Sequence, residues 1–417
     1  MEYGCIGEKL SHSFSKIIHN EICDYDYELY EIKKDELKTL LTERKFKAIN
    51  VTIPYKQDVI PYLDSIDEFA LKIGAVNTIV NKNGKLLGYN TDFSGMCCLI
   101  ENSKIDLKNK KVLILGSGGT SKTAFAVASY LGAKEIYKVS RKSTESSISY
   151  DDAYKLHNDA HIIINTTPVG MYPKIGESAI DISDFNKLEG VVDAVYNPLR
   201  TALVTSALKR GIKAVGGLYM LVAQAVFAAE LFTDKAIDNG EIDRIYKKIL
   251  LSKENIVLTG MPGCGKTTIG KALAKELNKE FIDIDDEIVK ETGKPITEIF
   301  AEGGEELFRN IETQVIKRFS ALQNCVISTG GGAILKEINI DFLKENGRIF
   351  YIDRPLEFLV TTNDRPLSSN QEMLKKRFEE RKDIYEATAD FKLRAGNDIH
   401  KNALALKEGF LNENFSN

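Results

Sequence analysis

Residues 260–267, Gly-Met-Pro-Gly-Cys-Gly-Lys-Thr, match the pattern G-x-x-x-x-G-K-[ST] and decide the fold of the rear part of the chain. An apolar run at residues 255–259 precedes them, and a helix-favouring stretch at residues 268–277 follows. Strand, glycine turn and helix in this order predict a P-loop, whose backbone N–H groups face the phosphates of a nucleoside triphosphate. Lys266 would reach the β- and γ-phosphates, and Thr267 would be a magnesium ligand. The alternative is a chance glycine turn, which would need neither flanking element.

A second glycine-rich turn, residues 116–121 (Gly-Ser-Gly-Gly-Thr-Ser), follows the apolar residues 112–115 and precedes a helix-like stretch at residues 122–130. Such a turn lets the backbone and a helix N-terminus approach the pyrophosphate of a dinucleotide. The pattern is GxGGxS rather than GxGxxG, so an ordinary α/β turn is the alternative. The next predicted strand ends in two cations, which suit the 2′-phosphate of NADP, although a solvated basic turn would look the same. The residues predicted to contact NADP here are Gly116, Ser117, Gly118, Gly119, Thr120, Ser140, Arg141 and Lys142.

The bulk composition is that of an ordinary globular protein with several domains. The chain has 417 residues, which is too long for one core, and its net charge of −4 leaves no basic surplus for binding nucleic acid. The 6 cysteines form no CxxC pair, so we expect reduced thiols and a cytoplasmic location. No signal peptide is expected at the start, and the most apolar stretch, residues 218–232, is too short to span a membrane.

Three successive alternations of strand and helix predict an α/β fold throughout. In the first, strands are expected at residues 3–7, 27–32 and 47–52, and helices at residues 15–23, 34–41 and 55–63, which favours a parallel sheet with crossover helices. In the second, strands are expected at residues 112–115, 135–140, 162–165, 191–193 and 214–215. Residues 142–152 are expected to form a surface loop, and residues 217–251 a long helical tract. The third begins at residue 255.

The predicted organisation has an N-terminal α/β substrate domain, a Rossmann-type domain and a P-loop α/β/α domain. The first covers residues 1–95 and is completed by residues 218–250, the second covers residues 96–217, and the third covers residues 253–417. No long linker separates the third domain from the others, so we expect close coupling across residues 252–254.

Polar residues in the opening part gather where parallel strands are expected to end. They lie in residues 12–16 (HSFSK), 50–56 (NVTIPYK), 74–78 (GAVNT) and 88–92 (GYNTD). Open α/β sheets bind ligands at this edge. Singly, each segment has a simpler interpretation: Ser15 could cap a helix, and Lys56 with Asp92 could form a surface ion pair.

Taken in order, these segments resemble shikimate dehydrogenase over residues 1 to about 250, together with residues 165–171 (NTTPVGM), 193–198 (DAVYNP) and 217–225 (GLYMLVAQA). The resemblance implies reversible reduction of 3-dehydroshikimate to shikimate with NADPH. Lys56 would donate the proton that the new alkoxide needs, and Asp92 would hold Lys56 and accept a substrate hydroxyl. The resemblance assigns the substrate to Ser13, Ser15, Thr52, Asn77, Tyr196 and Gln224. The resemblance also predicts three further residues that contact NADP: Thr166, Val195 and Gly217. The sequence departs from the family at Lys16, where proline is usual, and at Ser140, where asparagine is frequent.

The rear part resembles shikimate kinase over residues 253–417, which implies transfer of the γ-phosphoryl group of ATP to shikimate. Residues 281–285 (FIDID) alternate, so both aspartates are expected to point the same way from a strand. Asp283 would act on magnesium through water, and Arg365, from a short lid near residues 361–371, would stabilise the transferred group. The predicted ATP contacts are Gly260, Gly263, Cys264, Gly265, Lys266, Thr267, Thr268 and Arg365. The predicted shikimate contacts are Asp285, Arg309, Gly330, Gly331, Gly332 and Arg381, with the arginines gripping the carboxylate.

The sequence therefore predicts a bifunctional enzyme that performs two consecutive steps of the shikimate pathway with NADP(H), ATP and Mg²⁺, as a monomer or homodimer without nucleic-acid or membrane partners. One alternative is a quinate/shikimate dehydrogenase joined to a kinase for another polyol acid; the paired serines and the Arg141-Lys142 pair favour shikimate and NADP. Another is a nucleotide-sensing regulator with inactive sites. Retention of Lys56, Asp92, Lys266 and Asp285 argues against it.

Overall fold

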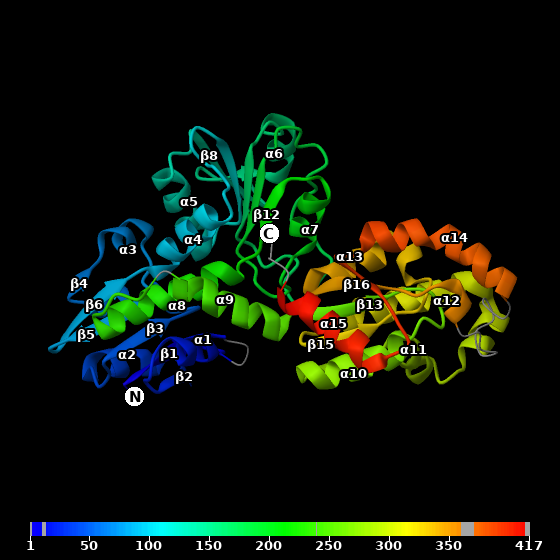
Figure 1. Cartoon of the computed structure of the whole chain (residues 1–417). Coiled ribbons are helices and arrows are strands. Elements are labelled where there is room, and N and C mark those ends of the chain that lie inside the picture. Colours follow the sequence, from blue (N-terminus) through cyan, green and yellow to red (C-terminus); the bar gives the residue numbers. More distant parts are fainter. Residues whose placement is uncertain (1, 11–13, 239, 360–370, 413–417) are drawn as a thin grey trace.

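Three β-sheets organise the chain (Figure 1). The computed structural model describes residues 2–10, 14–238, 240–359 and 371–412. In Figure 1 the first two sheets lie on the left and in the centre, the third lies on the right, and helices α8 and α9 run between the first two. Helices pack on the sheets throughout, so the α/β fold predicted from the sequence is confirmed.

The first sheet is mixed, with strand order β2-β1-β3-β5-β6-β4. Its strands are β1 (Tyr3–Gly7), β2 (Tyr27–Glu31), β3 (Ala48–Val51), β4 (Ser65–Ile66), β5 (Thr78–Lys82) and β6 (Lys85–Tyr89). The three predicted strands, β1, β2 and β3, pair in parallel as expected. Strand β5, which was not predicted, runs antiparallel to both β3 and β6 and makes the sheet mixed. The cause is a tight hairpin between β5 and β6, whose turn residues Asn83 and Gly84 have φ values of 54° and 83°.

The helices of the first sheet are α1 (Ser15–Ile22), α2 (Lys34–Glu43), α3 (Glu68–Ile73) and the 3₁₀ helix η1 (Ile60–Tyr62). The first two agree with prediction. The helix predicted at residues 55–63 was wrong, because this segment forms turns and only the short η1. Pro61 lies inside it and has no N–H to donate to an earlier carbonyl, which prevents a continuous α-helix.

The second sheet is parallel throughout, with strand order β12-β11-β10-β7-β8-β9. Its strands are β7 (Lys111–Leu115), β8 (Glu135–Ser140), β9 (Ile148–Ser149), β10 (Ile162–Asn165), β11 (Gly190–Asp193) and β12 (Lys213–Val215). Its helices are α4 (Thr91–Asn102), α5 (Gly119–Tyr130), α6 (Tyr150–Leu156) and α7 (Ala202–Lys209). The five strands predicted here are confirmed. The predicted loop at 142–152 is shorter than expected, because β9 and the start of α6 occupy its second half.

Helix α8 (Leu218–Thr233) packs against α4, and its apolar residues join one core with those of β7 and β10. The single helical tract predicted for residues 217–251 is two helices, because α8 ends before Asp234, whose φ is 56°, and α9 (Gly240–Lys253) follows. No helix among the described residues is long and apolar enough to cross a membrane.

The third sheet is parallel, with strand order β14-β15-β13-β16-β17. Its strands are β13 (Asn255–Thr259), β14 (Glu280–Asp283), β15 (Cys325–Ser328), β16 (Gly347–Asp353) and β17 (Phe391–Arg394). Its helices are α10 (Lys266–Leu277), α11 (Ile284–Thr292), α12 (Ile296–Ser320), α13 (Glu337–Asn346), α14 (Gln371–Thr388) and α15 (Ile399–Asn412), with the 3₁₀ helices η2 (Ala333–Leu335) and η3 (Leu356–Phe358). Asp283 ends β14, whereas Asp285 lies on α11. The prediction that both aspartates point from one strand was therefore wrong.

Buried charges join the second and third units. The guanidinium of Arg200 donates to Glu254 Oε1 (2.9 Å), to the carbonyl of Gly347 (3.0 Å) and to that of Lys344 (2.9 Å). Glu254 is fully buried and also accepts from Arg348 Nε at 2.9 Å. One carboxylate therefore serves a cation from each unit, and the loss of Glu254 would remove an ion pair from both guanidinium groups.

Glu345, at the same contact, makes folding sensitive to pH. Burial, opposed by a hydrogen bond from the Gly176 N–H and by the charge of Lys317 and helped by Asp341, raises the pKa of Glu345 from 4.5 to about 8. The folded protein therefore keeps a proton that the unfolded chain releases above its ordinary pKa. This contribution to stability is complete below pH 4.5 and is lost as the pH rises through 8.

We expect Glu345→Gln to make thermal unfolding less sensitive to alkaline pH. Between about pH 6 and about pH 9 the unfolding temperature of the native chain should fall more than that of the variant, because the amide cannot ionise. Scanning calorimetry at the two pH values measures this difference. Glu337→Gln is the control, since Glu337 is an exposed partner of Lys209. Parallel pH dependence in the native chain and Glu345→Gln would contradict the assignment.

Candidate functional site

Lys56 and Asp92 meet at the carboxyl edge of the first sheet. Lys56 Nζ donates to Asp92 Oδ2 at 2.6 Å, with both side chains mostly buried. Asp92 lies in the first turn of α4, which Asn90 caps by accepting from the Phe93 N–H. The carbonyl of Lys56 accepts from the Val76 N–H at 2.8 Å, which fixes the lysine backbone to the segment before β5. The pair is thus held by three separate parts of the chain, unlike a surface ion pair between two long side chains.

A chain of hydrogen bonds leads from α1 to α8 beside this ion pair. Tyr27 is hydrogen-bonded to Ser15 and donates to Asn50 Oδ1 at 2.6 Å. Asn50 donates to Thr78 Oγ1 at 3.1 Å, and Thr78 donates to Asn77 Oδ1 at 3.0 Å.

The hydrogen bonds continue from Asn77, whose Nδ2 donates to Thr91 Oγ1 at 3.1 Å. The Thr91 hydroxyl in turn lies 3.4 Å from Gln224 Oε1, on α8. The structure therefore brings together Ser15, Asn77 and Gln224, three of the predicted substrate contacts. Sequence reasoning did not select Tyr27, and no local motif distinguishes it from other strand tyrosines.

The other predicted substrate contacts are Thr52, Tyr196 and Ser13, and the structure describes the first two. Thr52 follows β3 directly, and its N–H donates to the Ile6 carbonyl at 2.9 Å. The ring of Tyr196 lies 5.4 Å from that of Phe14, which precedes Ser15. Phe14 occupies the cap position of α1 and Ser15 is its first residue, so the interpretation of Ser15 as a helix cap was wrong. Ser13 lies outside the described residues.

The turn after β7 has the geometry that a pyrophosphate requires. Gly116 has a φ of 112°, and a Cβ there would lie 2.8 Å from Thr166 Oγ1. Gly118 and Gly119 face open space, so a ligand could approach the backbone at the start of α5. Ser117 and Thr120 flank these glycines in the same turn.

Other predicted NADP contacts lie around this turn. Ser140 ends β8, which is paired with β7, and the exposed Arg141 and Lys142 follow it. The hydroxyl of Thr166 donates to the Leu115 carbonyl at 2.6 Å, and the Gly217 N–H donates to the Val195 carbonyl at 2.8 Å.

The P-loop of the third unit forms as predicted, between β13 and α10. Gly260, Gly263 and Gly265 have φ values of 145°, 77° and 100°, where side chains are strained. Lys266 Nζ donates to the carbonyls of Gly260 at 2.8 Å and Met261 at 3.0 Å. Cys264 is buried beneath the loop, and Thr268 lies in the first turn of α10.

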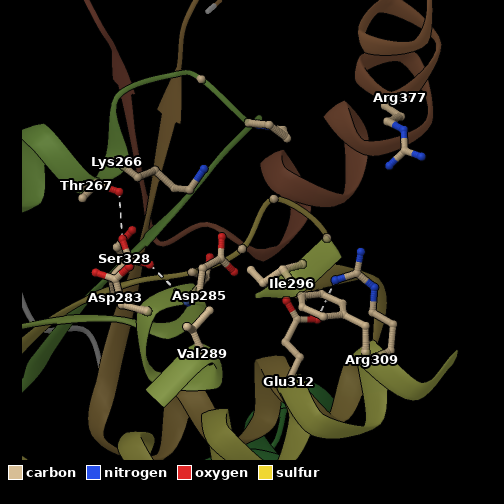
Figure 2. Close-up of a pocket in the computed structure, with 18 of the residues that line it drawn as sticks. Lys266, Thr267, Asp283, Asp285, Val289, Ile296, Arg309, Glu312, Ser328 and Arg377 are labelled. Atoms are coloured by element: carbon tan, nitrogen blue, oxygen red, sulfur yellow. Dashed lines mark hydrogen bonds and ion pairs between the residues drawn. The ribbon is translucent and has the colours of Figure 1, made fainter. Parts of the chain in front are cut away.

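A cavity of about 660 Å³ extends from this loop to helix α12 (Figure 2). Figure 2 shows Asp285 between Lys266 on one side and the pair Arg309–Glu312 on the other. Arg309 Nη1 donates to Glu312 Oε2 at 2.6 Å, and Arg381 Nη1 donates to the Gly331 carbonyl at 2.9 Å. A nucleotide-sized space therefore continues into a second compartment lined by carboxylates and arginines.

Glycines after β15 allow charged groups to crowd this compartment. A Cβ at Gly330 would lie 2.7 Å from Glu312 Oε1 and 2.9 Å from Asp285 Oδ1. A Cβ at Gly332 would lie 2.1 Å from Arg309 Nη2, and one at Gly331 would meet the Pro262 ring. The predicted glycine run is thus next to the predicted acceptor contacts.

The cavity residues that were missed from the sequence include Glu312, Arg354 and Arg377. Burial raises the pKa of Glu312 to about 7, although Arg309 opposes the shift. The (i, i+3) spacing of Arg309 and Glu312 on one helix was the available signal. Figure 2 shows Arg377 on α14, across the cavity from Asp283.

Thr267 and Asp283 supply the hard oxygen donors that Mg²⁺ prefers. Thr267 Oγ1 donates to Asp283 Oδ2 at 2.8 Å, at the phosphate end of the cavity (Figure 2). Within the described part of the chain no cluster of three or more His, Cys, Asp or Glu side chains could hold a metal by itself, so most other ligands would come from phosphate and water. Arg365 and most of the predicted lid lie outside the described residues.

Comparison with known proteins identifies both halves. Residues 5–79 match the shikimate dehydrogenase substrate binding domain, and residues 262–407 match the shikimate kinase family. The NADP(+)-dependent shikimate dehydrogenase of Clostridium beijerinckii is 40% identical over 262 residues, covering 58% of this chain and 96% of the relative. The chain belongs to the shikimate dehydrogenase family. The kinase match then makes it a bifunctional shikimate-pathway enzyme, with NADP and ATP as its cosubstrates.

Solved structures of related dehydrogenases resemble the front half of the chain. A chorismate mutase/shikimate 5-dehydrogenase fusion protein from Clostridium acetobutylicum is 38% identical, with a TM-score of 0.56 over 59% of this chain and 96% of that one. A quinate dehydrogenase from Corynebacterium glutamicum in complex with NAD is 27% identical, with a TM-score of 0.54 over 60% and 98%. The dehydrogenase fold thus also occurs fused to a chorismate mutase and in a quinate dehydrogenase.

We expect Gly332→Ala to weaken shikimate binding by the kinase without unfolding the protein. The new methyl group would displace the flexible end of Arg309 rather than backbone, so the KM for shikimate should rise by roughly tenfold or more. Steady-state ATP consumption at varied shikimate measures this, and the KM for ATP should change less than about twofold. Gly396→Ala, which meets nothing within 4 Å, is the control. An unchanged KM for shikimate would remove Arg309 from the acceptor compartment.

Proposed function

We propose that the front half reduces 3-dehydroshikimate to shikimate with NADPH and that the rear half phosphorylates the 3-hydroxyl of shikimate with ATP. The ion pair of Lys56 and Asp92 beside an ordered amide–hydroxyl network is the observation that carries the first reaction. The continuous cavity from the P-loop to Arg309 supports the second.

In the proposed reduction, bound NADPH supplies hydride to the substrate carbonyl. Lys56 stabilises the charge that develops on the oxygen and donates a proton to it. Asp92 holds the ammonium, 2.6 Å away, and accepts a substrate hydroxyl. Ser15 with Ser13 binds the carboxylate, and Thr52, Asn77 and Gln224 bind ring hydroxyls. Tyr196 closes the site from the cofactor side.

The proposed cofactor contacts follow the turn after β7. The backbone at Gly118 and Gly119, which faces open space, receives the pyrophosphate, with Gly116, Ser117 and Thr120 shaping the turn. Arg141 and Lys142 bind the 2′-phosphate, with Ser140 beside them, and this charge favours NADP over NAD. Thr166, Val195 and Gly217 would complete the contacts with NADP.

In the proposed phosphorylation, the P-loop and Lys266 would hold the phosphates, Thr267 would bind the magnesium ion and Asp283 would act on it through water. Asp285 orients the acceptor hydroxyl. Arg309 and Arg381 bind the shikimate carboxylate, and Glu312 holds the Arg309 guanidinium at 2.6 Å. The glycines at 330–332 let the ring approach the backbone, and Arg365 completes the phosphate end.

We also propose the domain division 1–95 with 218–250, 96–217 and 253–417, because each range carries one sheet. Six unpaired cysteines support a reducing compartment, such as the cytoplasm. A monomer or homodimer without nucleic-acid or membrane partners suits a chain with a net charge of −4.

We expect single substitutions to separate the two activities. Lys56→Ala should lower the shikimate-dependent reduction of NADP by roughly 100-fold or more, because the proton donor is lost, and leave ATP consumption unchanged. Asp285→Ala should do the reverse. Absorbance of NADPH and a coupled ADP assay on one preparation measure the two rates. Loss of both activities in either variant, or of neither, would show that the residue assignments are wrong.

The contact with the dehydrogenase and the kinase cavity lie at opposite edges of the third sheet. Arg200 contacts the amino ends of β13 and β16, at Glu254 and Gly347. The kinase cavity lies beyond the carboxyl ends of β13, β14 and β15. At about 3.3 Å per residue, a strand of this length separates the edges by about 20 Å. The kinase cavity therefore faces away from the edge that contacts the dehydrogenase, and we expect shikimate to pass between the two sites through solvent.

We expect no advantage from having both sites on one molecule. The lag before shikimate 3-phosphate appears should be the same for the native chain and for an equimolar mixture of Lys56→Ala and Asp285→Ala at equal concentrations of working sites. Rapid-quench measurements from 3-dehydroshikimate give both lags. A shorter lag for the native chain would reveal direct transfer.

A further inference from the structure

The loop that carries Tyr196 is closed by one buried carboxylate of the dehydrogenase. Asp193, at the end of β11, accepts from the Val195 N–H at 2.9 Å and from Thr201 Oγ1 at 2.7 Å. It also accepts from Asn165 Nδ2 at 3.0 Å. Both ends of the segment 194–201 are therefore fixed within the dehydrogenase itself, and in its middle the Asn197 carbonyl accepts from the Tyr172 N–H at 2.9 Å.

Three hydrogen bonds join Asn197 and the backbone of Leu199 and Arg200 to the kinase, besides those of the Arg200 side chain. Gln323 Nε2 donates to Asn197 Oδ1 at 3.2 Å, and the Leu199 N–H donates to Asn346 Oδ1 at 3.0 Å. The Arg200 N–H donates to the carbonyl of Glu345 at 2.9 Å. We call the kinase residues Gln323, Glu345 and Asn346 the docking face.

The docking face is itself firmly held. Asn346 is fully buried and donates to the Ser320 carbonyl at 3.1 Å, at the end of α12. The Arg200 side chain, joined to Glu254, prevents the loop from sliding along this face. A rigid partner therefore holds the loop at several neighbouring residues. Once the first hydrogen bond has ordered the loop, each further bond costs less conformational entropy.

The same region reaches the proposed carboxylate end of the dehydrogenase site. Tyr196 packs against Phe14, at 5.4 Å between ring centroids. Lys253, in the last turn of α9 where the chain enters the kinase, lies with Nζ 4.5 Å from the centre of the Phe14 ring. Phe14 directly precedes Ser15. Contacts from the kinase side and from the connecting helix thus converge on both segments that flank the proposed substrate.

We propose that Gln323 and Asn346 of the kinase are positioning residues for the dehydrogenase, since they hold the loop that places Tyr196. This inference rests on the proposed role of Tyr196. Both residues lie near the amino ends of β15 and β16, away from the kinase cavity. Shikimate binding by the dehydrogenase therefore depends on residues that phosphorylation does not use.

Gln323→Leu tests the proposal, because it removes the donor, keeps a similar volume and lies at a half-buried position. Loss of one hydrogen bond should raise the KM of the dehydrogenase for shikimate about 3- to 10-fold and change its kcat less than about twofold. Kinase kinetics should not change. Gln323→Glu should restore the native KM, because the Asn197 amide can turn and donate to the carboxylate.

Two controls distinguish the explanations. Lys209→Ala breaks another contact between the two halves, with Glu337 at 2.8 Å, but does not touch the loop, so the KM should stay unchanged. Tyr196→Phe tests the proposed role of Tyr196 directly. Hydrogen exchange at residues 194–201 reports the loop itself and should be faster in Gln323→Leu than in Lys209→Ala.

The outcomes separate clearly. Unchanged exchange and KM in Gln323→Leu, with a raised KM in Tyr196→Phe, would overturn the positioning role and leave the proposed function intact. An unchanged KM in Tyr196→Phe would refute the role of Tyr196, and with it the inference. A raised KM in Lys209→Ala as well would replace specific positioning by general loosening of the contact between the halves.

Discussion

The fully buried carboxylate of Glu254 holds the two halves of this enzyme in one arrangement. It lies in the single residue between α9 and β13 and accepts from Arg200 of the dehydrogenase and Arg348 of the kinase. A carboxylate removed from water is costly unless it is paired, and here two cations share it. The short connection between α9 and β13 and this triad together leave little freedom at the boundary. The docking of the loop 194–201 depends on it.

Charged side chains crowd together in the kinase cavity because glycines leave room for them. Asp285 and Glu312 come close to Gly330, Pro262 to Gly331 and Arg309 to Gly332, so glycine is favoured at these positions for steric reasons rather than for unusual dihedral angles. The P-loop shows the other use of glycine, because three of its glycines adopt positive φ. The same residue type thus admits phosphates in one turn and charged side chains in another.

The sequence predicted the elements that depend on local periodicity and on motif chemistry. The P-loop, the parallel strands of the second sheet and the meeting of Lys56 with Asp92 followed from such signals. The β5–β6 hairpin was missed although Asn83 and Gly84 signal a tight turn. The helix at 55–63 failed because Pro61 outweighs an apolar pattern.

Residues that act through long-range contacts could not be predicted. Tyr27 joins the substrate network only because β2 lies beside β1, and Gln323 meets Asn197 across 126 positions of sequence. Nothing within a few residues of either marks it, since the contact is made by the packing of whole units. Such partners become visible only when the sheets are assembled.

The direct connection of α9 to β13 fixes the ratio in which a cell makes the two enzymes. Each translated chain delivers one reductase and one phosphotransferase, so their ratio cannot drift with expression or turnover of separate products. The relative throughput of the two steps is then set by intrinsic rate constants and metabolite pools alone. Joining the two catalysts would matter for stoichiometry rather than for proximity.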